Sequence, residues 1–456
     1  MSDQSARAER VLPISGFPEY LPAERLVEQH ILDVIRRTFE LHGYASIETR
    51  AVEPVERLVG KGGDADKEIY GVSRLAAGAD ESSDAEKALG LHFDLTVPFA
   101  RYVLENAGKL TFPFKRYQVQ KVWRGERPQE GRYREFTQAD IDVVDAGTLS
   151  PHYEAEMPLV IAEIFRQLPI GEFRIQVNNR KIPEGFYRGI GLSDVAGTLR
   201  IVDKLDKIGP DKVRELLIAE GATSQQAEQV LALAAIRTED TGFVEQVRAL
   251  GVQDDGLEEG LEALAAVIRT GHELAPGTLV ADLRIARGLD YYTGTVYETQ
   301  LVGNESYGSI SSGGRYDALA SDGRTTYPGV GISIGVSRLL GLLLGRWGLT
   351  ASRSTPTVVL VALNAEEDRL AAMRTAATLR ERGIAVEVAP KADKFGKQIR
   401  YADRRGIPFV WFAGGPDGQD QVKDIRSGEQ VGADASTWAP PAEDLHPALV
   451  EPRHQG

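Results

Sequence analysis

A long stretch of alternating polar and apolar residues limits the folds that this chain can adopt more than any other feature does. Between Lys115 and Val144 the alternation runs through "KRYQVQKVWRGE" and then through "YREFTQADIDVV". The polar segment "RPQEGR", which contains proline and glycine, separates the two halves. Because a period of two is typical of strands with one buried face, this stretch predicts a long antiparallel hairpin. The chain must therefore build a sheet around two neighbouring antiparallel strands.

Other segments around the hairpin also have clear local patterns. Residues 22–41 have proline in the first turn, an apolar stripe at helical spacing and Gly43 after the end, which predicts an amphipathic helix. The following "YASIETRAVEP" alternates like a strand and ends at Pro54. Residues 59–90 are rich in Gly, Asp and Ser and predict a loop, broken by a short strand pair around "KEIYGVSRL". A helix is expected at residues 153–166, and a strand at "EFRIQVNNRKI".

The composition changes twice in the second half of the chain. Residues 185–272 are rich in Ala, Leu, Glu and Gln at helical spacing, as in "LEEGLEALAAVIRTG", which indicates a helical insertion. After residue 355, "TVVLVAL", "IAVEVAP" and "IPFVWFAG" alternate with helical patterns at residues 366–382 and 394–405. Such alternation predicts a compact α/β domain with a mainly parallel sheet.

Composition excludes several classes of site. The 456 residues include no cysteine, so disulfides, thiolate metal sites and cysteine nucleophiles are excluded. The seven histidines show no HExxH spacing, which argues against a metal site built from histidine alone. No apolar run approaches the ~20 residues of a membrane span, and the N-terminus has no apolar signal core. We therefore expect a cytoplasmic protein without a membrane partner.

Basic residues form two islands on an acidic chain. The net charge is −14, which argues against general binding of polyanions. Residues 115–134 nevertheless contain seven Lys and Arg against two Glu, and residues 391–405 contain six against two Asp. Two such islands suggest directed contacts with phosphate. On charge alone, a solvated basic face is an equally good interpretation.

Several arginines and glycines stand where a nucleotide can bind. There is no GxxxxGKS loop and no GxGxxG after a strand. Arg124 and Glu126 are two residues apart on the expected hairpin and would face the same side, so one can fork onto a phosphate while the other accepts from a base. An ordinary cross-strand salt bridge is the alternative. Arg338 in "SIGVSRLLGLLL" stands at a strand-to-helix turn, where it can also cap a carbonyl. Gly313 and Gly314 allow close approach of a ligand or form a plain turn.

The stretch "RIARGLDYYTGTVYETQ", residues 284–300, is too polar and glycine-rich for a core strand and too aromatic for a plain loop. With the other pieces in this order, the chain resembles class II aminoacyl-tRNA synthetases, and specifically the histidyl-tRNA synthetase family. Residues 26–54 are similar to the first class II motif, "VWRGERPQEGRYREFTQADID" to the second and "GVGISIGVSRLL" to the third. The stretches "ARGLDYYTGTVYE" and "SSGGRYD" resemble segments peculiar to the histidyl enzymes. The resemblance covers roughly residues 10 to 435.

The resemblance implies an overall architecture. It implies an α+β catalytic core with a mostly antiparallel sheet flanked by helices, formed by residues 1–184 and 273–350. Residues 185–272 would be the helical insertion domain. Residues 355–440 would be an anticodon-binding α/β domain with a mainly parallel sheet. The family works as a homodimer, with the first motif at the dimer interface.

The resemblance also implies a reaction and the residues that bind ATP. Histidine is activated by ATP, with Mg²⁺ at the outer phosphates, and is then transferred to the 3′ end of tRNA(His). Arg287 would approach the α-phosphate and the histidine, and Arg124 would contact the same phosphate. Arg338 would hold the γ-phosphate, Glu126 would read the adenine amino group, and Arg132 would help to hold the outer phosphates. No protein nucleophile is needed, so catalysis rests on positioning and charge stabilisation.

The amino-acid side follows from the same resemblance. Asp94 and Thr96 would hold the α-amino group of histidine, and Gln138 would reach the α-amino or carboxylate region. Asp142 and Tyr292 would bracket the imidazole, because a carboxylate and a phenol satisfy its donor and its acceptor.

Three further expectations complete the resemblance. Tyr291 alternates with Tyr292 and is expected to face the other way, into packing. The basic island at residues 115–134 would meet the acceptor stem of tRNA. The island at residues 391–405 would contact the anticodon arm, with Phe395 and Tyr401 available for stacking on unpaired bases.

Two rival functions are compatible with the same fold. One is a catalytically silent paralogue that acts as a regulatory subunit of ATP phosphoribosyltransferase in histidine biosynthesis. Such proteins typically lack the histidine-specific stretch and the C-terminal domain, both of which this chain has. The other is a synthetase for another amino acid, such as threonine or proline, against which "RGLDYYTG" argues. Without any resemblance, the residues support only a nucleotide-binding two-domain α/β protein.

Overall fold

The computed structural model describes residues 11–59, 68–74, 88–285, 291–414 and 418–451. The chain forms two compact units. The first comprises Met1–Pro18 and Ile31–Gly341, and the second comprises Glu19–His30 and Leu342–Gly456. Arg287 lies outside the described residues.

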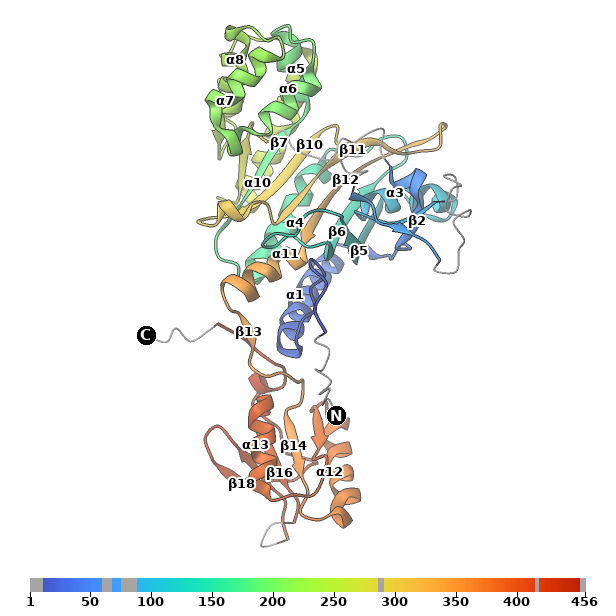
Figure 1. Cartoon of the computed structure of the whole chain (residues 1–456), viewed down its shortest axis with the longest axis vertical. Coiled ribbons are helices and arrows are strands. Elements are labelled where there is room, and N and C mark those ends of the chain that lie inside the picture. The colour runs from blue at the N-terminus through green and yellow to red at the C-terminus, as the bar shows by residue number, and fades with distance from the viewer. Residues whose placement is uncertain (1–10, 60–67, 75–87, 286–290, 415–417, 452–456) are drawn as a thin grey trace, which may run out of the picture. The chain divides into compact units, whose positions relative to one another are not determined.

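The first unit is built on a large mixed sheet (Figure 1). Its nine strands lie in the following order: β1 (Ala45–Ser46), β5 (Phe114–Trp123), β6 (Glu135–Val144), β12 (Thr326–Gly335), β11 (Ser311–Ser321), β10 (Thr295–Leu301), β7 (Phe173–Asn179), β9 (Leu279–Asp282) and β8 (Arg237–Thr238). The pairs β1–β5 and β7–β9 are parallel, and the other neighbours are antiparallel. The hairpin predicted from the alternating sequence is present as β5 and β6, with Arg116 opposite Asp142 and Gln120 opposite Gln138.

The two faces of this sheet differ in chemistry because the side chains alternate. On one face large apolar residues of five strands are buried: Tyr117, Ile141, Ile332, Tyr297 and Val177. Helix α4 (His152–Gln167) covers part of this face. Tyr297 donates a hydrogen bond to the backbone carbonyl of Glu154 on that helix, over 2.6 Å. The opposite face carries polar residues and glycines at the alternate positions, which leaves it available for a ligand.

Short elements surround the sheet. Helix α1 spans Pro22–Leu41, as predicted. The segment "YASIETRAVEP" forms two short strands, β1 and β2 (Val52–Pro54), which join different sheets. β2 pairs with β4 (Leu89–Leu91), which pairs with β3 (Gly71–Val72). The remaining short helices of this part are α2 (Val55–Leu58), α3 (Thr96–Asn106) and α11 (Val336–Leu340).

A group of helices follows β7, as the composition predicts. They are α5 (Lys181–Gly189), α6 (Val195–Val202), α7 (Leu205–Ala219), α8 (Ser224–Ala234), α9 (Phe243–Arg248) and α10 (Asp255–Leu274). Helix α8 begins with a capping box in which Thr223 and Gln226 satisfy each other's backbone amides. Helix α10 packs against α4, α5 and β7 through buried residues such as Leu257, Leu261 and Leu264. Helix α10 therefore packs on the large sheet as well as within the helical group.

The second unit contains a five-stranded sheet with the order β15 (Val386–Val388), β14 (Val359–Ala362), β16 (Phe409–Phe412), β17 (Gln421–Asp424) and β18 (Gln430–Gly432). Helices α12 (Arg369–Glu381) and α13 (Phe395–Arg405) connect the parallel strands. The strands β16, β17 and β18 are antiparallel, so the sheet is mixed rather than mainly parallel. Their connections are too short for the dozen or more residues that a parallel crossover needs. Two further strands, β13 (Thr350–Ala351) and β19 (Leu449–Val450), pair separately.

Among the described residues, we find no helix with both the length and the apolar character needed to cross a membrane.

Candidate functional site

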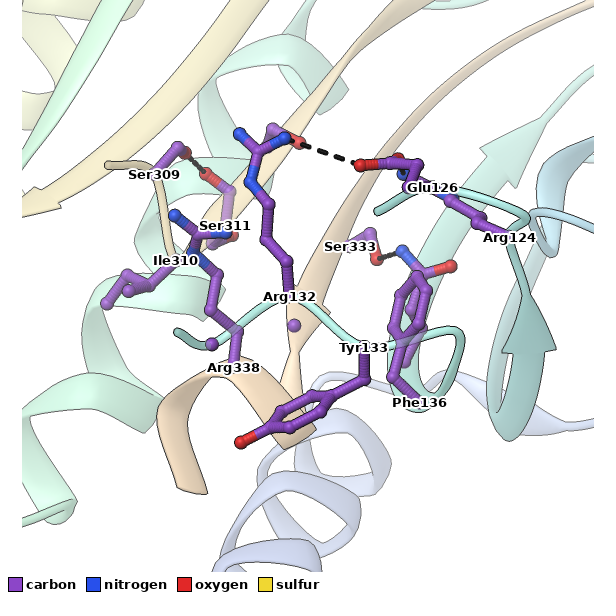
Figure 2. A pocket seen from close by; sticks show the side chains of 14 residues that line it. Arg124, Glu126, Arg132, Tyr133, Phe136, Ser309, Ile310, Ser311, Ser333 and Arg338 are labelled. Atoms are coloured by element: carbon purple, nitrogen blue, oxygen red, sulfur yellow. Dashed lines mark hydrogen bonds and ion pairs between the residues drawn. The ribbon is translucent and has the colours of Figure 1, made fainter. Parts of the chain in front are cut away.

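A polar pocket of about 240 Å³ opens on the polar face of the large sheet (Figure 2). It lies where the β5–β6 hairpin meets the end of β12 and the start of α11. Its lining residues are mostly polar or charged: Arg124, Glu126, Gly131, Arg132, Tyr133, Phe136, Gln138, Ser309, Ile310, Ser311, Ser312, Ser333, Gly335 and Arg338. Arg124, Glu126, Arg132, Gln138 and Arg338 were all expected from the sequence to bind a ligand, and the pocket brings these five together.

Arg124 is held in place by groups outside the pocket. The sequence suggested that Arg124 and Glu126 share one face of a strand. Strand β5 ends at Trp123, however, so both residues lie beyond the strand and its alternation does not apply to them. The Nε of Arg124 donates to the backbone carbonyl of Phe93 over 3.0 Å, and its guanidinium lies 5.2 Å from the centre of the Phe136 ring. Its Nη1 is 3.9 Å from Glu126, a loose ion pair. The side chain is therefore oriented, and its terminal nitrogens are available for an anion.

Arg132 and Glu126 face each other across the loop of the hairpin, as Figure 2 shows. The Nη1 of Arg132 is 3.4 Å from the carboxylate of Glu126, and the Arg132 side chain is half-exposed. The loop turns at Gly131, whose φ is +67°. A Cβ at Gly131 would lie 2.0 Å from the hydroxyl of Tyr307, so only glycine fits this turn.

Arg338 forms the opposite wall of the pocket from α11. Its guanidinium donates to the backbone carbonyl of Tyr307 and lies 5.0 Å from the centre of that ring. Its Nε has no hydrogen-bond partner among the described residues. Burial lowers the pKa of Arg338, and the nearby charge of Arg132 lowers it further. Three guanidinium groups against one carboxylate give the pocket a net positive charge, which suits a polyanionic ligand such as a triphosphate.

Gln138 connects this pocket to the acidic part of the same sheet face. Its Nε2 donates to the hydroxyl of Ser333 over 2.8 Å. Its Oε1 is buried and has no hydrogen-bond partner in the described part of the chain. Because an unmade buried hydrogen bond is costly, this oxygen is a ready acceptor for an N–H group of a ligand.

Asp142 lies four residues further along β6 on the same face, roughly 13 Å away. Its side chain is fully buried, pairs with Arg116 over 2.6 Å and accepts a hydrogen bond from the Tyr316 hydroxyl over 2.8 Å. Burial raises its pKa to about 6 despite the opposing effect of Arg116. The neighbouring strand supplies Gly331, where a Cβ would lie only 2.2 Å from the Asp142 carboxylate. The glycine therefore makes room for the acidic side chain.

The two tyrosines before β10 lie together rather than on opposite faces. Their rings are 4.9 Å apart at an angle of 76°, and the hydroxyl of Tyr291 donates to Asp94 over 3.3 Å. Tyr291 packs against buried residues, as expected, but it does not face away from Tyr292. Strand β10 begins only at Thr295, so strand alternation does not apply to these two tyrosines. The Tyr292 ring lies over Gly314, where a Cβ would be 2.9 Å from it.

Asp94 lies at the start of α3, where Thr96 is the first helical residue. One carboxylate oxygen of Asp94 accepts from the backbone amide of Val97 over 3.1 Å, which satisfies a free amide of the first turn. The other oxygen accepts from Tyr291. Burial raises the pKa of Asp94, while the amide of Val97 and the charge of Arg124 oppose the shift. Asp94 is thus placed between the cationic pocket and Asp142.

Three residues of this face were missed by the interpretation of the sequence: Arg116, Asp140 and Tyr316. Asp140 is buried, its pKa is raised to about 7 by burial, and its Oδ1 has no hydrogen-bond partner among the described residues. The alternation of the hairpin contained a signal for Asp140, which is two residues from Asp142 on one expected strand and so shares its face. The position of Arg116 opposite Asp142 depends on the register of β5 and β6. The contact of Tyr316 with Asp142 carried no such signal, because it depends on the pairing of β11, β12 and β6.

Comparison with known proteins agrees with this geometry. Residues 16–339 match the family model of histidyl-tRNA synthetase, and residues 357–437 match that of an anticodon binding domain. The histidine–tRNA ligase of Micrococcus luteus is 65% identical over 453 residues, which cover 97% of this chain and 99% of the relative. That of Cutibacterium acnes is 58% identical over 450 residues, covering 97% and 99%.

Solved structures show the same relationship. The crystal structure of histidyl-tRNA synthetase from Nostoc sp. PCC 7120 superposes with a TM-score of 0.83 at 38% identity, covering 94% of this chain and 97% of that one. A Bacillus halodurans protein described as an ATP phosphoribosyltransferase regulatory subunit/histidyl-tRNA synthetase has a TM-score of 0.70 at 20% identity, covering 86% and 97%, and shares the fold. On the match of the family model and the two full-length relatives, the chain belongs to the histidyl-tRNA synthetase family.

Proposed function

We propose that this chain acts as a histidine–tRNA ligase. It would activate L-histidine with ATP to histidyl-adenylate and pyrophosphate, and then transfer histidine to the 3′ end of tRNA(His). The full-length relatives with this activity support the assignment. The single structural observation that carries it is the division of one sheet face into a cationic pocket and a buried acidic cluster. A triphosphate fits the first, and a substrate with an ammonium group and an imidazole fits the second.

On the nucleotide side, the arginines would stabilise charge rather than react. Arg124 would contact the α-phosphate, Arg338 the γ-phosphate and Arg132 the outer phosphates, while Glu126 would accept from the adenine amino group. Arg287 would approach the α-phosphate and the histidine carboxylate from the segment outside the described residues. Donors that are already oriented cost little reorganisation when charge develops in the transition state. The contact of Arg124 with the Phe93 carbonyl supports such preorganisation.

On the amino-acid side, buried acceptors would select histidine. Asp94 and Thr96 would hold the α-ammonium group, and Gln138 would reach the α-amino or carboxylate region. Asp142 and Tyr292 would bracket the imidazole, with Asp142 accepting from a ring N–H. Gly331 and Gly314 support this assignment, because they leave room on the sheet for the Asp142 carboxylate and the Tyr292 ring.

Mg²⁺ would accompany the nucleotide. The described residues include no group of three or more His, Asp or Glu side chains that could hold a metal ion. In nucleotide sites, Mg²⁺ is usually held mainly by substrate phosphates and water. Bound there, it would offset the negative charge of the β- and γ-phosphates, and Arg132 and Arg338 would act beside it.

The division of the chain into domains is part of the proposal. Residues 1–184 and 273–350 would form the catalytic core, residues 185–272 the insertion domain and residues 355–440 the anticodon-binding domain. In the last, Phe395 begins α13 and is 40% exposed, so it is available for stacking on a base. Tyr401 is less available because its hydroxyl contacts Glu387 and Arg405.

A homodimer in the cytoplasm is also proposed. Val11, Leu12 and Ile14, which are close together in the sequence, are strongly exposed apolar side chains of the first unit. A cluster of exposed apolar groups supports an interaction surface there. The compartment follows from the proposed tRNA substrate, since aminoacylation supplies translation.

The proposed function is tested by ATP–pyrophosphate exchange with each of the twenty amino acids, purified protein and Mg²⁺. We expect exchange with histidine and none above background with the others. Exchange with threonine or proline instead would assign another substrate. No exchange with any amino acid would favour the silent regulatory paralogue, and binding to a catalytic ATP phosphoribosyltransferase subunit would then be measured.

Ending the chain at residue 350 should separate the two half-reactions. Because the nucleotide pocket and the acidic cluster lie entirely within Ile31–Gly341, we expect histidine-dependent exchange to stay within about threefold of the full chain. Charging of tRNA(His) should fall by at least tenfold, since the anticodon contacts are gone. The control is thermal unfolding of both proteins. Equal loss of both activities would show that the C-terminal unit serves folding rather than tRNA binding.

A further inference from the structure

Arg116 is a buried cation to which the proposed reaction gives no role. It lies near the start of β5, opposite Asp142 on β6, and its side chain has no exposed surface. A fully buried arginine is rare and needs a partner, because the charge loses its hydration. Its position on the polar face of the sheet makes Arg116 part of the floor under the amino-acid site.

The contacts of Arg116 come from β5, β6 and the start of α3. Its Nη1 donates to the Oε1 of Gln118 on β5 over 3.5 Å. Its Nη2 lies 2.6 Å from one oxygen of Asp142 and 3.3 Å from the backbone carbonyl of Leu95, which it donates to. Its guanidinium lies 4.3 Å from the centre of the Phe99 ring on α3. Its Nε has no hydrogen-bond partner in the part of the chain that the structure describes. The ion pair with Asp142 is therefore its strongest contact.

The charge of Arg116 acts on three buried carboxylates, one of which, Asp94, is also affected by Arg124. Asp94, Asp140 and Asp142 are each at most 3% exposed. Burial raises the pKa of all three, and in each case the charge of Arg116 acts in the opposite direction. Without Arg116, buried carboxylates this close together would take up protons near neutral pH, since like charges in a low dielectric cannot all remain ionised. Asp142 is the one that Arg116 touches.

We propose that Arg116 is a positioning residue of the amino-acid site: its ion pair keeps Asp142 a carboxylate and holds it in the orientation that accepts the ring N–H of histidine. This inference rests on the proposed function but assigns a role to a residue that does not touch the substrate. Tyr316 fixes the other oxygen of Asp142 from β11. Each carboxylate oxygen has two lone pairs, so acceptor capacity remains for the imidazole.

The groups that face Asp142 come from every neighbouring element. They are Arg116 on β5, Asp140 on β6, Tyr316 on β11, Asp94 before α3, and Tyr291 and Tyr292 before β10. Among these groups only Arg116 is a cation. Removing it therefore moves the pKa of Asp142 upward from about 6, so that at pH 7 a protonated acid replaces the acceptor. The protonated form cannot accept the ring N–H at that oxygen, and raising the pH restores the acceptor.

The test compares Arg116→Gln, Arg116→Lys and the unaltered chain in histidine-dependent ATP–pyrophosphate exchange between pH 6.5 and 9. We expect Arg116→Gln to raise KM for histidine at least tenfold at pH 7, with the ratio to the unaltered chain falling steadily toward pH 9. Because both proteins use the same substrate, the titration of free histidine cancels in this ratio. Arg116→Lys, which keeps the charge, should lie between them, and KM for ATP should change by less than twofold. Arg353→Gln is the matched control, since Arg353 is also a buried arginine, 5% exposed, but lies in the second unit.

The possible results distinguish a failure of this inference from a failure of the proposed function. A KM ratio for Arg116→Gln that is raised but constant with pH, or one within twofold of unity at pH 7, overturns the inference while the proposed function stands. No exchange with histidine by the unaltered chain overturns both. Should Arg116→Gln fail to fold, Tyr316→Phe removes the other hydrogen bond to Asp142 and is expected to shift the same KM profile to higher pH by a smaller amount. An unshifted profile of Tyr316→Phe would then overturn the inference.

Discussion

Replacing Arg124 by alanine is expected to lower histidine-dependent ATP–pyrophosphate exchange by roughly 10²–10³-fold, the usual loss when one preorganised donor to a developing charge is removed. Arg124 is suited to this role because its Nε is used by the Phe93 carbonyl and the Phe136 ring lies beneath the guanidinium. These contacts orient the guanidinium of Arg124 before a ligand binds. The loss should therefore appear mainly in kcat, with a smaller rise in KM for ATP, when exchange is measured over a range of ATP concentrations.

Two further variants make this expectation specific. Arg124→Lys keeps a positive charge but loses the planar fork, so its activity should fall between those of the alanine variant and the unaltered chain. Arg324→Ala removes an exposed arginine from the turn between β11 and β12, outside the pocket, and should stay within twofold of the unaltered chain. If the Arg124→Ala variant catalysed exchange as fast as the Arg324→Ala variant, Arg124 would not be a catalytic residue.

The parts of the fold that follow from local pattern could be predicted from the sequence. The alternation of residues 115–144 predicted strands β5 and β6, and the apolar stripe of residues 22–41 predicted α1. The direction of β17 was not predicted, because "IPFVWFAG" marks a buried strand but carries no information on its neighbour. The split of residues 44–54 into β1 and β2 was missed for a similar reason: which sheet a strand joins depends on distant partners.

The residues of the candidate site also fall into two groups, those that the sequence indicated and those that depend on distant partners. The arginines of the pocket and Gln138 were expected because the chain resembles a family whose motifs contain them. The pair of Arg116 with Asp142 depends on which residue of β5 lies opposite which residue of β6, and one residue of slippage would separate them. Gly331 is similar, since its closeness to Asp142 becomes visible only when β12 is placed beside β6. Contacts across strands therefore required the structure.

The second large effect is expected at Asp142. Asp142→Asn keeps the shape of the side chain but removes its charge, and the new amide can turn an N–H group toward the ring N–H of histidine. A buried site that is built to pair with a polar group discriminates by about 10⁴-fold in favourable cases, so we expect KM for histidine to rise by at least ~10². The KM for ATP should change little, because Asp142 lies outside the lining of the cationic pocket.

Stability must be separated from recognition in this experiment. Asp142→Asn leaves Arg116 without its closest carboxylate, and breaking a buried ion pair costs about 3–5 kcal/mol when no other partner replaces the lost one. Asp94 and Asp140 remain close enough to interact with Arg116, so the loss in free energy of unfolding should fall below that range. Asp145→Asn, just beyond the end of β6, is the control and should change neither quantity. A variant that loses stability but keeps the KM for histidine would show that Asp142 is needed for the sheet and not for the substrate, because a buried acceptor that contacts the ring cannot be neutralised without weakening binding.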